Sequence, residues 1–425
     1  MRTRHRFRWP ALFLAGALIM AACADNDVEP ETDADDDTEA TEEVAEEEPD
    51  DDADESDDDA EAADEPADEQ SEGRESEWFD EAEFDAQMAW RDMEPEGPEG
   101  EPWVQYIDAE FRDTSEWATD APWDVCFSNA AVDNPWRQVG WTTMQAEVEL
   151  HDDIGNFTAV DAGGSDEAQI ADIEELLERG DCDVLIVSPN TTAALTPIVE
   201  QAAEELPVIV FDRGVNTDAT ATFIQPIGGY AFGAEAAEFL VDNVPEGGNI
   251  VALRILPGVD VLETRWVAGQ IIMEEAGLNI IASEFTEGDT ATVRSIIDDI
   301  LDRGEEIDGV WMDAGATAVA AIEAFEARGL EVPPITGEDQ NDFLQKWDQE
   351  GLTAIGPTFP TYQWRTPIIA ATMILQGEEV PVQWTLPQDP VTQENLDDHL
   401  FDDMPPLYYA QSGAEDMPGF PERWQ

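Results

Sequence analysis

The stretch 124–144 carries side chains suited to holding a polar ligand. It begins with a short apolar run at 125–127, continues through a polar turn, and then enters a helical pattern that starts at a proline. A buried strand that leads directly into a loop and a helix is the first unit of an open α/β sheet, and such sheets bind ligands beyond the carboxyl ends of their strands. We therefore expect Asn134, Trp136 and Arg137 at a ligand site, where they offer an amide, a large ring and a forked cation.

The elements that would position these side chains follow from a regular alternation of apolar runs and amphipathic stretches after residue 123. The apolar runs are 124–128, 156–161, 183–187, 207–211, 220–225, 249–255, 278–284, 309–313, 333–337 and 353–356. Helical patterns fill the gaps at 168–180, 191–205, 229–243, 261–276, 290–303 and 315–328. This alternation predicts parallel sheets covered by helices on both faces. The runs are too numerous for one small sheet, so we expect two α/β domains.

The composition is strongly acidic, with 101 acidic residues against 18 basic ones and a formal net charge of -83 among 425 residues. Such a charge repels nucleic acid and anionic lipid, so nucleic-acid binding through a basic patch is excluded. Because the acidic residues continue through the part expected to fold, we interpret the host as an organism of high salt. Near 1 M salt the Debye length is about 3 Å, which makes self-repulsion of this size tolerable.

The first 23 residues have the features of an export signal. Four arginines precede the apolar stretch 11–20, which is too short to span a bilayer. The stretch ends in Met20-Ala21-Ala22-Cys23 and resembles a bacterial lipoprotein signal, in which Cys23 would be lipidated. The alternative is a plain secretory signal with an incidental cysteine. Both kinds of signal predict an extracytoplasmic protein. The lipoprotein signal also predicts a lipid anchor on the cell membrane.

Three further segments flank the regular pattern. Residues 24–77 are almost entirely acidic, small or Pro and contain no aromatic residue, so we expect a disordered, extended tether. Residues 78–123 are rich in aromatic side chains and predict an extension that packs on the body, and residues 396–425 form a C-terminal tail without a clear period. The acidic residues show no fixed ligand spacing, so no metal site is predicted.

Two cysteines of the folded part, Cys126 and Cys182, are predicted to be free buried thiols. An exported protein can form disulfides. However, aligning Ser128 beside Ser188 offsets the two cysteines by about four residues, or about 13 Å along a strand. That separation exceeds the spacing that a disulfide allows.

Five stretches together resemble the type I periplasmic sugar-binding proteins, the ribose-binding group in particular, which are the substrate-binding components of ABC importers. The stretches are 128–137 (SNAAVDNPWR), 183–189 (DVLIVSP), 207–213 (PVIVFDR), 308–313 (DGVWMD) and 334–339 (PITGED). The resemblance covers roughly residues 124–395 and implies two Rossmann-like lobes joined by a three-segment hinge. It places the first lobe at 124–226 with 358–386, and the second lobe at 227–357 with 387–395.

The resemblance also implies which residues hold the ligand. Carried over by position, the ligand-binding set is Asn134, Trp136, Arg137, Asp212 and Arg213 from the first lobe, Arg265, Asp313 and Asp339 from the second, and Thr358 at the hinge. Asp212 and Arg213 have the alternative of a surface ion pair, and Asp313 that of a helix cap. Glu338, beside Asp339, should point the other way if the two residues end a strand.

The sequence departs from the family's pattern at three of these places. Arg137 stands where many relatives have a second aromatic residue, Gly288 stands about where the second lobe usually offers a stacking ring, and Ala314 replaces a common Asn. These departures predict an incomplete aromatic sandwich. Arg137 would then recognise a carboxylate, a phosphate or additional hydroxyl groups.

The functional prediction is a solute-binding lipoprotein that captures a sugar or polyol and delivers it to the permease of an ABC importer. We expect a monomer, no cofactor and no catalysis, because neither His151 nor His399 has a plausible triad setting and no nucleophile or phosphate-binding motif is present. Two alternatives stay open: a ligand-sensing lipoprotein for signalling or chemotaxis, and a paired-carboxylate glycosidase.

Overall fold

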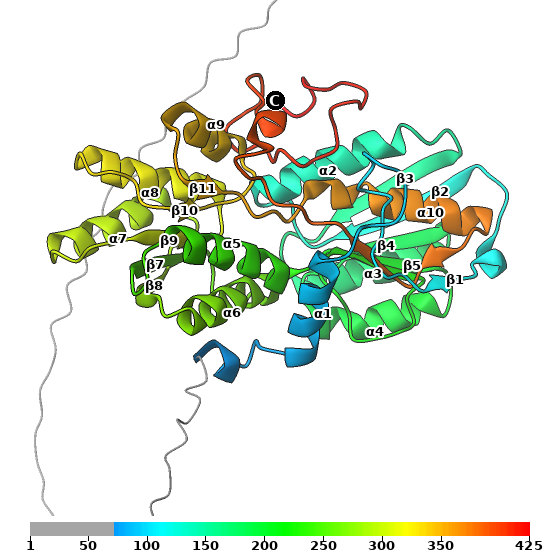
Figure 1. Cartoon of the computed structure of the whole chain (residues 1–425). Helices are drawn as coiled ribbons and strands as arrows, with labels where there is room; N and C mark the ends of the chain where they lie inside the picture. The colour runs from blue at the N-terminus through cyan, green and yellow to red at the C-terminus, as the bar shows by residue number, and fades with distance from the viewer. Residues whose placement is uncertain (1–71) are drawn as a thin grey trace, which may run out of the picture. The chain divides into compact units, whose positions relative to one another are not determined.

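The computed structural model describes residues 72–425, which form two parallel α/β sheets with helices on their faces (Figure 1). One sheet has six strands in the order β13-β6-β5-β4-β2-β3, and the other has five in the order β11-β10-β9-β7-β8. Every neighbouring pair within the two sheets is parallel. The predicted fold class is confirmed. We call the six-stranded sheet with its helices the first lobe, and the five-stranded sheet with its helices the second lobe.

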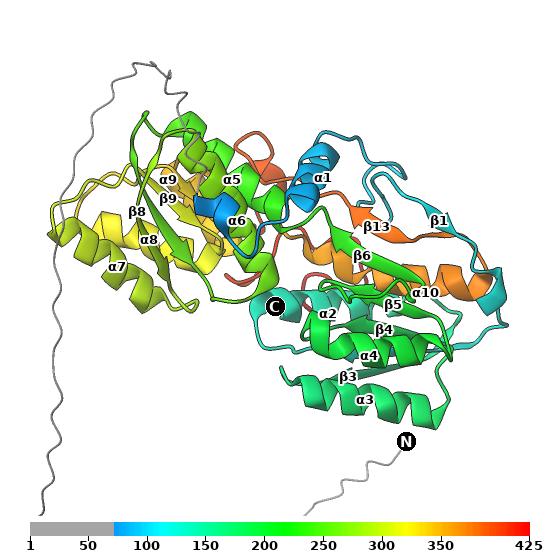
Figure 2. The same cartoon turned by 90° about the horizontal axis from the view of Figure 1, so that it is seen from below.

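The first lobe is built on strands whose side chains are buried on both faces, such as the all-buried run of β4. Its strands are β2 (Trp123–Asn129), β3 (Ile154–Asp161), β4 (Val184–Ser188), β5 (Val208–Phe211), β6 (Thr222–Pro226) and β13 (Gln383–Leu386). Helices α3 (Asp166–Arg179) and α4 (Thr192–Ala203) cover one face (Figure 2). Helices α2 (Pro135–Val148) and α10 (Thr366–Gln376) cover the other, together with the short helix η3 (Thr361–Trp364).

The second lobe repeats this plan with shorter strands. Its strands are β7 (Asn249–Arg254), β8 (Asn279–Phe285), β9 (Gly309–Met312), β10 (Ile335–Thr336) and β11 (Ala354–Ile355). Helices α5 (Gly229–Asn243) and α6 (Asp260–Glu275) pack on one face. Helices α7 (Thr290–Asp302), α8 (Gly315–Ala327) and α9 (Asn341–Glu350) pack on the other.

The chain crosses between the lobes three times, and the crossings are bonded to one another. The first follows β6, the second follows β11, and the third follows β13, after which Val391 pairs with Gly356 beside the second sheet. The Gln388 side chain accepts from the Gly228 N–H at 2.8 Å and donates to the Gly228 carbonyl at 3.1 Å. The Thr358 hydroxyl donates to the Asp389 carbonyl at 3.0 Å. These bonds hold the three connections together as one hinge region.

The segment before β2 contacts both lobes. Helix η1 (Glu72–Glu75) and helix α1 (Glu81–Arg91) lie on α6 and α5, where Arg74 pairs with Glu275 and Arg91 pairs with Glu235 and Glu238. Further along, β1 (Phe111–Arg112) pairs with β12 (Val380–Pro381), and η2 (Ser115–Trp117) packs on α10.

Some predictions fall outside the described residues. The signal 1–23, the lipidation site Cys23 and all but the last six residues of the predicted tether 24–77 belong to the part that the structure does not describe. Between residues 72 and 425, none of the helices combines the length and the apolar character needed to cross a membrane. The only regular element after β13 is the short helix η4 (Leu396–His399).

The prediction of free thiols at Cys126 and Cys182 is wrong, because the two residues form a disulfide with their Cα atoms 5.7 Å apart. The register places Asn129, not Ser128, beside Ser188, which still leaves an offset of three residues. The larger error was to count the distance to Cys182 at the rise of a strand, although Cys182 precedes the strand. Cys182 precedes β4, where the chain arrives from α3, and it packs with Cys126 in the core between the sheet and helices α3 and α4.

We expect the disulfide to stabilise the fold substantially. It closes a loop with a sequence separation of 56, for which the loop-closure entropy corresponds to about 4 kcal/mol. The double variant Cys126→Ala/Cys182→Ala should therefore unfold at a clearly lower urea concentration than the wild type, and reductant should lower the wild-type midpoint but leave the variant unchanged. Thiol counting in denaturant that found both cysteines free would contradict this expectation.

Candidate functional site

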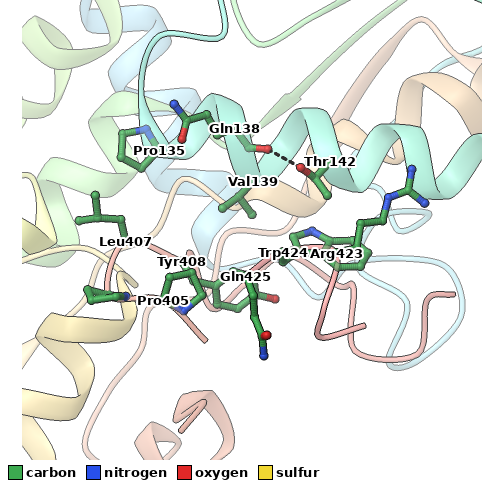
Figure 3. A pocket seen from close by; sticks show the side chains of 11 residues that line it. Pro135, Gln138, Val139, Thr142, Pro405, Leu407, Tyr408, Arg423, Trp424 and Gln425 are labelled. Atoms are coloured by element: carbon green, nitrogen blue, oxygen red, sulfur yellow. Dashed lines mark hydrogen bonds between the residues drawn. The ribbon is translucent and has the colours of Figure 1, made fainter. Parts of the chain in front are cut away.

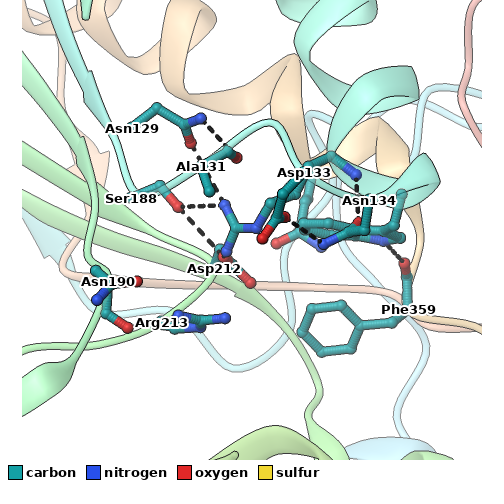
Figure 4. A network of polar contacts seen from close by, with 12 residues as sticks. Asn129, Ala131, Asp133, Asn134, Ser188, Asn190, Asp212, Arg213 and Phe359 are labelled. Atoms are coloured by element: carbon teal, nitrogen blue, oxygen red, sulfur yellow. Dashed lines mark hydrogen bonds and ion pairs between the residues drawn. The ribbon is translucent and has the colours of Figure 1, made fainter. Parts of the chain in front are cut away.

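A buried polar network at the carboxyl edge of the first sheet is centred on Arg137. Figure 4 shows its partners Asn129, Ser188 and Asp212 close together. The Arg137 Nη2 pairs with Asp212 Oδ2 at 2.5 Å, and the two side chains are only 4% and 6% exposed. Its Nη1 donates to Ser188 Oγ at 3.2 Å and to Asn129 Oδ1 at 3.4 Å. Asn129, Ser188 and Asp212 end or follow β2, β4 and β5, three adjacent strands of the sheet. The predicted site residues Arg137 and Asp212 are thus brought together as an ion pair.

Asp212 has an unusual backbone at this edge. Its φ is 69°, in the left-handed region that few non-glycine residues adopt. Residues held in this region cluster at ligand sites, where the surrounding structure compensates the cost. Arg213 does not pair with its neighbour Asp212 and instead donates through Nη1 to the Asn190 carbonyl at 2.5 Å. The surface ion pair considered for Asp212 and Arg213 is therefore absent, because Arg137 occupies the carboxylate.

The amino end of α2 positions the remaining first-lobe candidates. Asn134 is the N-cap of this helix, and its Oδ1 accepts from the Arg137 N–H at 3.0 Å. The Trp136 Nε1 donates to the Phe359 carbonyl at 2.7 Å, and the two rings lie 5.9 Å apart. Trp136 is half-buried and Asn134 is exposed. Phe359 follows Thr358 in the hinge region, so α2 is bonded directly to a crossing between the lobes.

On the second lobe, Arg265 is held inside a buried cluster. It lies on α6, is 4% exposed, and donates through Nη1 to Glu338 Oε1 at 2.9 Å and to the Asp313 carbonyl at 3.3 Å. Its guanidinium lies 3.9 Å from the centre of the Phe232 ring and 5.5 Å from that of Phe359. Aromatic faces attract a guanidinium at such distances. Phe359 therefore contacts both Trp136 of the first lobe and Arg265 of the second.

The position of Arg265 depends on a close approach of α5 and α6. A Cβ atom at Gly233 of α5 would lie 1.9 Å from the Arg265 carbonyl oxygen, which no side chain can accommodate. Glycine at this position lets the two helices meet closely enough to set Arg265 beside Phe232, the neighbour of Gly233.

Two aspartates at the carboxyl edge of the second sheet complete the cluster. Asp313 follows β9 and Asp339 lies beyond β10, and both are fully buried. Burial, together with the nearby charge of Glu338, raises the pKa of each carboxyl to about 7, although Arg265 acts in the opposite direction. Arg265, Asp313 and Asp339, all predicted from the sequence, are thus brought together.

Each of these three residues has a buried polar atom without a hydrogen-bond partner in the described part of the chain. The atoms are Arg265 Nε, Asp313 Oδ1 and Asp339 Oδ1. An unpaired buried polar group costs about 1–3 kcal/mol, so three in one cluster are unusual for a purely structural arrangement. One donor and two acceptors are therefore available at this edge to groups of a bound molecule.

The expectation that Glu338 points away from the site is wrong. Its Oε1 pairs with Arg265, and its Oε2 accepts from the Tyr409 hydroxyl at 2.8 Å. The alternation of a strand does not apply, because β10 ends at Thr336 and leaves both Glu338 and Asp339 free to turn inward. A buried arginine requires a buried carboxylate partner, and this requirement is the signal that could have found Glu338.

The remaining positions singled out in the sequence are Thr358, Gly288 and Ala314. Thr358 bonds to the adjacent crossing rather than to a site group. Gly288 lies in a turn with φ 68°, and Ala314 precedes α8 without a side-chain cap. A groove of about 590 Å³ lies between α2 and the C-terminal residues (Figure 3), and none of the predicted site residues lines it.

Because the pKa values of Asp313 and Asp339 are raised in the folded chain, the free energy of unfolding depends on pH. An unfolded Asp titrates near 3.9, whereas Asp313 and Asp339 titrate at about 7. Between these values the folded chain holds protons that the unfolded chain has released, so the free energy of unfolding contributed by these groups falls as the pH rises from about 4 to 7. The slope is at most about 1.4 kcal/mol per pH unit for each proton.

We expect Asp313→Asn to weaken this pH dependence in urea unfolding between pH 4.5 and 7.5, because an amide does not titrate. Asp289→Asn is the matched control. Asp289 caps α7, and hydrogen bonds from Thr292 and Ala291 lower its pKa, so its contribution is present above about pH 4 and is lost on acidification. An unchanged slope for Asp313→Asn would contradict the assignment.

Known binding proteins resemble this chain in sequence. The sequence model of the periplasmic binding protein domain matches residues 125–379. The ribose import binding protein of Bacillus subtilis is 24% identical over 236 residues, which are 55% of this chain and 76% of that protein. The D-xylose-binding periplasmic protein of Escherichia coli is 27% identical over 250 residues, 57% of this chain and 72% of that protein.

Solved structures share the fold at low sequence identity. An ABC transporter solute binding protein from Thermobispora bispora superimposes with a TM-score of 0.59 and 22% identity, covering 68% of this chain and 90% of that one. A solute binding protein from Bacillus halodurans with bound myo-inositol has a TM-score of 0.57 and 23% identity, covering 66% of this chain and 98% of that one.

Proposed function

The chain belongs to the family of periplasmic binding proteins, and we propose that it captures a sugar or polyol between its two lobes for an ABC importer. The observation that carries this proposal is the pair of buried polar clusters at the carboxyl edges of the two sheets. The second-lobe cluster keeps one donor and two acceptor atoms unpartnered within the described residues. Membership of this family favours a binding protein over an enzyme.

The chemistry of the clusters suits hydroxyl groups. A hydroxyl both donates and accepts, so carboxylates such as Asp313 and Asp339 and a guanidinium such as that of Arg265 can satisfy it together. The rings of Trp136 and Phe359 offer apolar surface to the C–H face of a sugar. The low dielectric of a closed site strengthens each of these bonds.

The clusters also supply a mechanism for capture. A ligand that bonds to the first-lobe groups around Asp212 and to the second-lobe groups around Arg265 makes its full set of contacts only when the lobes are closed. Binding therefore shifts the equilibrium toward the closed form by its difference in affinity for the two forms. The permease of the importer would then recognise the closed form.

The class of ligand is supported by the names of the relatives. The matched proteins are described as binding ribose or D-xylose, and a structural neighbour holds myo-inositol. Arg137 is already paired with Asp212, so it would offer the ligand only donors beyond those used in that pair. This arrangement favours a neutral sugar or polyol over a phosphate or carboxylate, which would need an uncompensated cation.

We expect the wild-type chain to bind at least one member of a panel of sugars, polyols and sugar acids, measured by calorimetry in high salt. Above pH 7, where the Asp313 carboxyl is ionised, Asp313→Asn should weaken that binding about tenfold or more, because a hydrogen bond to a charged group is lost. Asp289→Asn, in an exposed turn of the same lobe, should change it less than twofold. Equal affinities for all three chains would place the ligand elsewhere.

We also propose that Cys23 is lipidated, so that the protein is held on the outer face of the cell membrane, and that the chain is a monomer. The sequence Met20-Ala21-Ala22-Cys23 after an apolar stretch supports this proposal. Cells labelled with a radioactive fatty acid should incorporate it into the wild-type chain but not into Cys23→Ala. Equal labelling of both chains, or none of either, would refute the lipid anchor.

A further inference from the structure

The C-terminal segment 404–425 packs on the second lobe where α9 begins. The Asn341 N–H donates to the Tyr408 carbonyl at 2.8 Å, and the Asp342 N–H donates to the Pro406 carbonyl at 2.9 Å. The first N–H groups of a helix have no partner inside the helix, so the segment supplies acceptors that α9 requires. The Asn341 side chain also donates to the Met404 carbonyl at 3.1 Å.

The same segment packs on α2 of the first lobe. Met404, Tyr408, Ala414, Met417 and Trp424 share one buried apolar cluster with Val139 and Ala146 of α2. The Trp424 Nε1 donates to Thr143 Oγ1 at 3.1 Å. Figure 3 shows Tyr408 and Trp424 beside Val139 and Thr142 of this helix. The segment therefore spans from one lobe to the other.

Gln411 is the residue at which the two sets of contacts meet. Its N–H donates to Asp339 Oδ2 at 2.7 Å, and its carbonyl accepts from the Tyr362 N–H at 3.0 Å. Tyr362 belongs to the core of the first lobe, whereas Asp339 is a candidate ligand group of the second. One residue thus connects a site carboxylate to the opposite lobe.

Tyr409 of the same segment holds the carboxylate of Glu338. Its hydroxyl donates to Glu338 Oε2, while Glu338 Oε1 pairs with Arg265. Both oxygens of Glu338 are therefore used, and the carboxylate can present itself to Arg265 in only one orientation. Residues 404–425 lie beyond the part that the family's sequence model matches, so these contacts are additional to the matched domain.

We propose that the C-terminal segment is a working part of the ligand site, with Tyr409 as the positioning residue for Glu338 and, through it, for Arg265. The inference rests on the proposed function. Removal of the hydroxyl leaves the Glu338 carboxylate free to rotate in a buried site, and Arg265 then loses its fixed direction. Since a hydrogen bond to a charged group is lost, ligand affinity should fall about tenfold.

The chain offers a matched pair of variants for the test. Tyr408 and Tyr409 are adjacent, both are buried, and each hydroxyl makes one hydrogen bond, but that of Tyr408 goes to Ser412 and not to a site carboxylate. The probe is whichever of D-ribose, D-xylose and myo-inositol binds the full wild-type chain most tightly. Tyr409→Phe should weaken its binding about tenfold, and Tyr408→Phe less than twofold.

A pH profile separates positioning from a general loss of packing. Burial raises the pKa of Glu338, whereas the charge of Arg265 and the hydrogen bond from the Tyr409 hydroxyl lower it. The other charged groups that face Glu338 are Asp313 and Asp339, whose pKa values its charge raises. Without that hydroxyl the pKa of Glu338 rises further. Affinity should therefore begin to fall at a higher pH in Tyr409→Phe than in the wild type or in Tyr408→Phe.

The outcomes are distinguishable. Wild-type binding with equal loss in the two variants, or with coincident pH profiles, would overturn the role of Tyr409 and leave the proposed function intact. Failure of the wild-type chain to bind any of the three probes, or any member of the wider panel, would overturn the proposed function and this inference with it.

Discussion

The structure depends on the burial of two arginines, each beside a carboxylate, at the carboxyl edges of its two sheets. Arg137 pairs with Asp212 in the first lobe, and Arg265 pairs with Glu338 in the second. Moving such charges out of water is costly, and their attraction repays that cost only with good geometry and further hydrogen bonds. A buried ion pair is therefore weak evidence of selection for stability. It is better explained by a function that requires charged groups in a dry site.

The two lobes reach this arrangement by the same route. In each, the arginine comes from the helix that follows the first strand of its sheet, α2 after β2 and α6 after β7. In each, the carboxylate comes from the chain just after another strand, beyond β5 or β10. Parallel strands bring these ends to one edge, so residues far apart in the sequence meet there. The hinge region joins the two edges through Phe359, which contacts Trp136 and Arg265.

The sequence predicted what depends on local pattern and on family resemblance. The alternation of apolar runs and helices predicted the two parallel sheets, and the resemblance to periplasmic sugar-binding proteins is confirmed at the level of the family. The burial of Arg265 beside Asp313 and Asp339 agrees with the positions carried over from that family. Their contact with a ligand stays a prediction.

The sequence did not predict contacts made by residues that lie just outside a strand. Cys182 and Glu338 were both placed by extending a strand, and both lie outside one. Strand periodicity carries no information beyond the last paired residue, so neither the disulfide nor the pair with Arg265 could be read from it. Tyr409 and Gln411 were missed for a different reason. The segment that carries them has no period, and its contacts with the site are set entirely by tertiary packing.

The ion pairs of the chain fall into two groups that salt affects differently. Surface pairs such as Arg303–Glu305 contribute little and are screened within a Debye length of about 3 Å near 1 M salt. Buried pairs such as Arg137–Asp212 and Arg265–Glu338 are screened much less, because little solvent reaches them. High salt would therefore relieve the self-repulsion of the acidic surface and leave the polar geometry of the site in place. Among the described residues, the buried cations of the two sheet edges are thus those whose interactions salt would weaken least.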